Sequence, residues 1–175
     1  MKQLLFAITI LLSIQTASAQ YRDQTDDRKI FISIGGEVGA PSSTPYNFTY
    51  GATAQAEVKI INHLGLTLTG EYIAYNYKST LFMSANTQQH PSFIPLKAGL
   101  KYYSGPSFYF AGELGSTVQS NSGVSNMLVY SLGFGFNIPV NKFSGVDIGF
   151  SYQNYDQSQY QTTGLKVAYR LGWWV

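Results

Sequence analysis

The sequence predicts an all-β fold, an eight-stranded antiparallel up-and-down transmembrane β-barrel. From Ile30 onward, apolar and polar residues alternate in segments of about ten residues, which is the pattern of transmembrane β-strands. Charged residues make up 11% of the chain, against about 25% in ordinary soluble domains. No segment after residue 20 is apolar over the roughly 20 residues that a spanning helix needs. A membrane protein without such helices must be a closed barrel, because only helices and barrels satisfy every backbone group in hydrocarbon.

Residues 1–19 have the features of a signal peptide. Lys2 supplies the positive charge, an apolar stretch follows from Leu4 to Ile14, and Ala17-Ser18-Ala19 forms the small-residue cleavage site. The alternative, a retained membrane anchor, would need a longer apolar stretch. We expect cleavage after Ala19, a periplasmic lead-in over 20–29 and a barrel over 30–175.

Eight alternating segments are separated by clusters of Gly, Pro, Asn and Ser. They cover 30–39, 50–61, 64–76, 94–103, 108–116, 127–138, 146–155 and 164–175. The connections after the second, fourth and sixth segments are short, and the other four are longer. Outer-membrane barrels have short periplasmic turns and longer extracellular loops, so this alternation predicts the orientation of the strands.

Following the side chains along each segment divides the sheet into an apolar face and a charged face, because successive residues of a strand point to opposite sides. From Ile30 on, thirteen residues are charged, and Lys78, Lys142 and Asp156 lie in or beside connections. The other ten share one face: Glu37, Glu57, Lys59, Glu71, Lys97, Lys101, Glu113, Asp147, Lys166 and Arg170.

The alternation leaves open which face points inward. With the apolar face inside, the chain would be a soluble periplasmic lipocalin-like barrel that binds an apolar ligand, but few charges would remain to keep its surface soluble. With the charges outside, each Lys or Arg at the bilayer midplane would cost about 2–4 kcal/mol. We therefore expect the ten charged residues to form an ion-pair network that, with Phe31 and Tyr109, plugs the lumen of an eight-stranded barrel.

Outward-facing aromatic residues form two bands around a middle rich in Leu, Ile and Ala. The periplasmic band contains Tyr102, Phe108, Phe136 and Trp173, and the band near the long loops contains Phe48, Tyr50, Tyr72, Tyr130 and Tyr152. Two such bands are typical of the two membrane interfaces. The alternative is that they are ordinary strand-forming residues in the core of a soluble sandwich.

The last segment, GLKVAYRLGWWV (164–175), resembles the C-terminal strand of bacterial outer-membrane proteins, which in that family is read by the barrel-assembly machinery. The whole pattern over 30–175 is similar to the small eight-stranded barrels of the OmpX/OmpA transmembrane-domain type. This resemblance implies insertion in the outer membrane of a Gram-negative bacterium, among its lipid and lipopolysaccharide. It also implies a structural role, or loops that bind a host or envelope ligand in adhesion. The formal net charge of +2 gives no reason to expect a nucleic-acid partner.

Some small barrels act on lipid A, and one short segment of this chain resembles their active site. His90-Pro91-Ser92 resembles the His-x-Ser of lipid A deacylases, with Glu113 as the acid that would orient the histidine. Against a hydrolase, His90 lies in a long loop and Glu113 is expected to face the lumen. His63 is interpreted as a turn residue. With two histidines and no cysteine, we expect no metal site. We also expect no cofactor and no enzyme activity.

The long loops are rich in Ser, Asn, Gln, Pro and Tyr. Aromatic and amide side chains suit recognition on exposed loops, although the same composition also fits loops that are merely soluble. Phe82 and Met83, in the longest loop, are the candidate extracellular contact.

Overall fold

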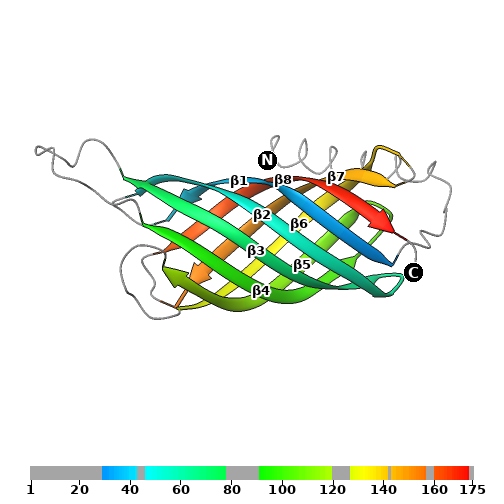
Figure 1. The fold of residues 1–175 in the computed structure, drawn as a ribbon, viewed down its shortest axis with the longest axis horizontal. Coiled ribbons are helices and arrows are strands. Elements are labelled where there is room, and N and C mark those ends of the chain that lie inside the picture. The colour runs from blue at the N-terminus through cyan, green and yellow to red at the C-terminus, as the bar shows by residue number, and fades with distance from the viewer. Residues whose placement is uncertain are drawn as a thin grey trace, which may run out of the picture.

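The computed structural model describes residues 29–42, 46–77, 91–119, 127–141, 143–156 and 160–173. These residues form one closed antiparallel barrel in which each strand pairs with its neighbours in sequence and β1 also pairs with β8 (Figure 1). The strands are β1 (Ile30–Pro41), β2 (Tyr46–Ile61), β3 (Leu64–Tyr77), β4 (Ser92–Tyr103), β5 (Phe108–Gln119), β6 (Met127–Pro139), β7 (Ser144–Tyr155) and β8 (Gln161–Trp173). The predicted fold class is confirmed.

Several strands extend farther toward the long loops than the sequence predicts. β2 starts at Tyr46 instead of residue 50, and β8 starts at Gln161 instead of residue 164. The added residues are largely polar, so the apolar alternation stops while the hydrogen-bonded pairing continues, as between Pro41 and Thr162.

The ladder between β3 and β4 has one gap. The paired residues pass from Gly70 and Leu96 directly to Ile73 and Phe93, with no pairing at Pro95. Proline has no N–H to donate, so a proline inside a strand removes a ladder hydrogen bond. On its other side Pro95 is still paired with Thr117 of β5.

The charged face lines the lumen and the apolar face points outward. Lys101 and Asp147 have exposed fractions of 0%, whereas Ile34 is 67% exposed. The lipocalin-like alternative, with the apolar face inside, is therefore wrong. At several positions the neighbouring strands approach so closely that only glycine fits. A Cβ on Gly99, for example, would collide with the carbonyl oxygen of Gly112 on the next strand.

Candidate functional site

The outer surface of the barrel is an apolar belt. Aliphatic side chains such as Ile34, Leu68 and Leu132 are exposed around its middle, and aromatic residues such as Tyr50 and Tyr102 are exposed nearer its two ends. Phenylalanines on β5, β6 and β7 also contact one another, as Phe134 does with Phe150 at 5.5 Å between ring centroids. So large an exposed apolar surface is unfavourable in water and matches the lipid-facing band of a membrane barrel.

A first cluster of charges lies in the half of the lumen nearer Ile30 and Trp173, at the start of β1 and the end of β8. Lys101 Nζ is 3.1 Å from Asp147 Oδ2 and 3.4 Å from Glu57 Oε2. Arg170 Nη2 is 3.0 Å from the same Glu57 oxygen. Tyr109 donates a hydrogen bond of 2.5 Å to Asp147 Oδ1. The two acids and two bases thus balance one another within a buried group.

Aromatic rings close the lumen beside this cluster. Tyr103 donates a hydrogen bond of 2.5 Å to Glu57 and accepts one of 2.9 Å from Arg170. The guanidinium carbon of Arg170 lies 3.7 Å from the centroid of the Phe31 ring, and the Lys59 ammonium lies 5.1 Å from it. These are cation–π distances, which let the rings stabilise the positive charges as well as fill space.

A second cluster of charges lies nearer the long loops. Lys97 Nζ is 2.9 Å from Glu71 Oε1 and 3.5 Å from Glu113 Oε2. Thr69 donates a hydrogen bond of 2.6 Å to Glu113, and Gln153 donates one of 3.0 Å to Glu71. Hydrogen bonds of this kind are what buried carboxylates require to offset their loss of solvation.

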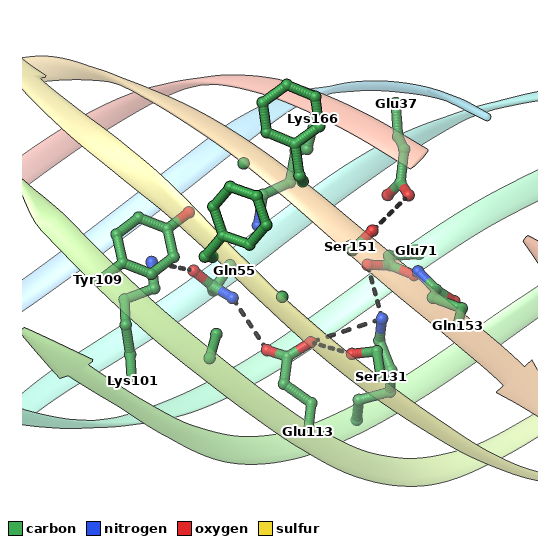
Figure 2. Close-up of a pocket in the computed structure, with 16 residues that line it drawn as sticks. Glu37, Gln55, Glu71, Lys101, Tyr109, Glu113, Ser131, Ser151, Gln153 and Lys166 are labelled. Carbon is green, nitrogen blue, oxygen red and sulfur yellow. Dashed lines mark hydrogen bonds and ion pairs between the residues drawn. The ribbon is translucent and has the colours of Figure 1, made fainter. Parts of the chain in front are cut away.

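Gln55 joins the two clusters, as Figure 2 shows. Its carbonyl oxygen accepts a hydrogen bond of 2.9 Å from Lys101 of the first cluster. Its amide nitrogen donates one of 3.0 Å to Glu113 of the second cluster and one of 2.9 Å to Thr69. A neutral side chain therefore makes the lumen into one continuous polar network.

Beside Gln55 the lumen holds a small polar cavity, also visible in Figure 2. Glu37 and Lys166, which face each other across the β1–β8 pairing, both line it. Glu37 accepts a hydrogen bond of 3.0 Å from Ser151. The cavity measures about 30 Å³, which suits a water molecule or two, whereas ligand pockets start near ~300 Å³. It has no room for an organic ligand.

The loop end of the lumen is filled by a third group of uncharged, mostly aromatic residues. Tyr46, Ile73, Tyr75, Phe93 and Met127 are buried together, with Tyr77 and Tyr160 packed against them. Tyr75 meets Phe93 edge-on at 5.5 Å between centroids, and Phe93 also contacts Tyr155. The charged clusters are thus enclosed between aromatic layers at both ends.

All ten charged residues predicted for the network point into the lumen, and seven of them form the ion pairs given above. Of the other three, Lys59 lies over aromatic rings, and Glu37 and Lys166 line the cavity. The prediction missed the neutral members that connect the charges. Their positions in the alternating pattern could have identified them, because these residues lie on the same inward face as the charges: Gln55, Thr67, Thr69, Tyr103 and Gln153.

Of the residues proposed for a hydrolase, the structure describes Ser92 and Glu113 and places them far apart. Ser92 begins β4, whereas Glu113 is paired with Gly99, seven residues further along that strand. At ~3.3 Å per residue this separates them by more than about 20 Å. The Glu113 carboxylate also already pairs with Lys97 and accepts hydrogen bonds from Thr67 and Thr69. His63 lies in the β2–β3 turn, where its carbonyl accepts a hydrogen bond of 2.8 Å from the Tyr103 amide.

Three residues singled out from the sequence, Phe82, Met83 and His90, lie outside the described residues. In the part of the chain that the structure describes, no group of three or more His, Cys, Asp or Glu is placed to hold a metal ion. No helix there is both long enough and apolar enough to span a bilayer.

Neither a protein-family model nor a curated protein matches the sequence. Solved structures do match. Ail, the attachment invasion locus protein of Yersinia pestis, matches with a TM-score of 0.56 and 16% identity over 82% of this chain and 99% of Ail. Neisserial surface protein A matches with a TM-score of 0.59 and 14% identity over 82% of this chain and 97% of that one.

The chain resembles the small eight-stranded outer-membrane β-barrels. A de novo designed transmembrane β-barrel also matches, with a TM-score of 0.50 and 11% identity over 82% of this chain and 97% of the design. These identities are low, so what the likeness establishes is the fold. The predicted resemblance to this class of barrel is confirmed.

Proposed function

We propose that this protein is an integral outer-membrane barrel of a Gram-negative bacterium that serves a structural role or binds ligands outside the cell through its loop end. Two observations support insertion in the membrane. The outward face is apolar between two aromatic bands, and the fold is that of transmembrane barrels.

The closed lumen is the observation that carries the interaction role. Aromatic layers lie at both ends, two ion-pair clusters lie between them, and the cavity admits only water-sized molecules. Within the described residues the lumen leaves no path for a solute and no room for a ligand. A partner would therefore bind at the loop end of the barrel. Such binding requires neither a cofactor nor a catalytic site.

Several further expectations belong to this proposal. Residues 1–19 would direct export and be removed, residues 20–29 would remain in the periplasm, and the barrel would occupy 30–175. The C-terminal strand would be read by the barrel-assembly machinery, and lipid and lipopolysaccharide would surround the belt. The ten-residue ion-pair network would stabilise the barrel from inside. Phe82 and Met83 would be the first residues to test for contact with an extracellular ligand.

A solved relative in fold supports ligand binding by such a barrel. Ail has been crystallised in complex with the heparin analogue sucrose octasulfate, and that structure matches this chain with a TM-score of 0.51 and 17% identity. The name of Ail refers to attachment and invasion. At this identity the comparison supports the class of function and not the ligand.

Fractionation, a gel-shift assay and an adhesion assay together test the proposal. We expect the protein in the outer-membrane fraction, with faster migration before heating than after it, and adhesion of expressing cells to a host or envelope surface. Protease added to intact cells should cut only within 77–93 or 117–126. Recovery from the soluble periplasm would overturn the membrane assignment, and unchanged adhesion after deletion of the gene would overturn the interaction role.

A further inference from the structure

The loop end of the barrel carries almost no charge. Among the described residues beyond the second ion-pair cluster, Asp156 is the one charged side chain. The sequence of the connecting segments adds Lys78 and His90. Recognition of a sulfated or phosphorylated polyanion depends on clustered Arg and Lys, so this end is poorly suited to a polyanionic ligand.

The same end carries three tyrosines in contact, Tyr77, Tyr46 and Tyr160, here called the tyrosine tier. The centroid of the Tyr46 ring lies 5.0 Å from that of Tyr77 and 5.8 Å from that of Tyr160. The planes of the outer two are inclined by 39° and 34° to the plane of Tyr46. The three rings therefore form one contiguous aromatic group, in which Tyr46 is buried and Tyr77 and Tyr160 are partly exposed.

The tier offers two partly exposed aromatic rings, Tyr77 and Tyr160, and the tyrosine hydroxyl groups. Tyr77 and Tyr160 are only half buried, and the Tyr46 hydroxyl is within hydrogen-bonding reach of both. The exposed amide of Asn47 follows Tyr46, and the half-exposed amide of Gln161 follows Tyr160. Aromatic faces with polar groups at their edges suit a ligand that is apolar on one side and hydroxylated around its rim.

Rings beneath the tier hold it in place. Tyr75 packs edge-on against Tyr46 at 5.1 Å and against Tyr160 at 5.4 Å between centroids. The Tyr75 hydroxyl is 2.9 Å from Thr162 Oγ1, which fixes this ring to β8. Because the support comes from strands on several sides of the barrel, the tier is preformed and would lose little conformational entropy on binding.

We propose that the tyrosine tier binds an uncharged saccharide, with the C–H face of a sugar ring packed on Tyr77 and Tyr160 and its hydroxyls bonded to the tyrosine hydroxyls. The lack of charge at this end decides between a neutral and an anionic sugar. This inference rests on the proposed function, because it assumes that the loop end faces the exterior.

Binding is tested with the full barrel in lipid nanodiscs, using calorimetry with chitotetraose, maltotetraose and mannotetraose as neutral probes and heparin as the anionic probe. We expect at least one neutral probe to bind and heparin not to bind. Tyr77→Ala and Tyr160→Ala should each weaken binding at least tenfold. Tyr77→Phe and Tyr160→Phe, which keep the ring, should weaken it by a few fold only. Tyr169→Ala removes an outward, lipid-facing tyrosine and should leave binding unchanged.

Every variant is first checked for the heat-dependent gel shift. If an alanine variant fails to fold, Tyr77→Leu keeps much of the volume without an aromatic face and should weaken binding to the same extent. Binding of heparin alone, or neutral binding that survives loss of both rings, would overturn the saccharide assignment. If those results came with intact adhesion of expressing cells, the proposed function would stand and only the ligand class would be wrong.

Discussion

The side-chain amide of Gln55 donates a hydrogen bond of 3.0 Å to Glu113 across the lumen, from β2 to β5. The same amide accepts a hydrogen bond of 2.9 Å from Lys101. Lys101 and Glu113 belong to different ion-pair clusters, so one neutral residue couples them. Because Lys101 and Glu113 are both removed from water, their charges are stabilised only by hydrogen bonds and ion pairs within the lumen, and losing any one of these is costly.

Replacing Gln55 with leucine should destabilise the barrel without unfolding it. Lys101, Glu113 and Thr69 would each lose one buried hydrogen bond while keeping other partners, and one hydrogen bond contributes about 0.5–1.5 kcal/mol net. We expect the free energy of unfolding in urea, measured in lipid vesicles, to decrease by about 1.5–4.5 kcal/mol. Gln161→Leu, at the half-exposed start of β8, is the control and should change it little. An unfolding free energy equal to that of the wild type would show that Gln55 does not couple the clusters.

The position of the charges could be predicted, because side chains alternate with a period of two and ten charges share one parity. Gln55 and Tyr103 share that parity too, but nothing in a neutral residue marks it as a link between ion pairs. The pairs themselves, such as Lys101 with Asp147, depend on which strands face each other across the lumen. That relation follows from closure of the barrel and not from any one strand.

The place of Tyr46 in the aromatic layer at the loop end could not be predicted from alternation. Phe48 and Tyr50 point outward, so simple parity would also place Tyr46 outward. A register shift between Tyr46 and Phe48 turns Tyr46 inward, where it packs on Tyr75. A bulge adds one residue to a strand and reverses the parity beyond it, and the sequence of β2 gives no mark of its position.

Replacing Lys101 with methionine should be among the most damaging single changes in the lumen. Asp147 and Glu57 would lose a shared cation 3.1 and 3.4 Å away. Breaking a buried ion pair from one side costs about 3–5 kcal/mol, because the remaining charge stays unsolvated. We expect a loss of that size in the unfolding free energy, and partial recovery when Asp147→Asn is added.

The control for Lys101 is Lys29→Met, which removes the same charge from an exposed position at the end of the barrel. This variant should unfold like the wild type. A double variant no more stable than Lys101→Met alone would indicate that Lys101 acts by filling space and not by pairing.

A positive charge on the belt should be tolerated at its edge and not at its middle. Leu132 and Ile61 are both 61% exposed, but Leu132 lies in the middle of β6 between Tyr130 and Phe134, whereas Ile61 adjoins the β2–β3 turn. An outward Arg costs about 2–4 kcal/mol at the bilayer midplane and about 0–1 kcal/mol near the interface. We therefore expect Leu132→Arg to lower the unfolding free energy in vesicles by the larger amount and Ile61→Arg by the smaller. Equal effects of the two variants would contradict a membrane that surrounds this belt.

Two glycines on opposite faces of the sheet, Gly99 and Gly112, test which face packs inside the barrel. Gly99 faces the lumen, and a Cβ there would collide with the Gly112 carbonyl and lie 2.7 Å from the Glu113 Cα. Gly112 faces outward, and a Cβ there would meet only the Leu132 side chain, at an ordinary 3.5 Å. Overpacking typically costs about 1–3 kcal/mol, so Gly99→Ala should lower the unfolding free energy by about that much and Gly112→Ala should leave it nearly unchanged. Both variants are measured by urea unfolding in vesicles, and a larger loss for Gly112→Ala would mean that the two faces are assigned the wrong way round.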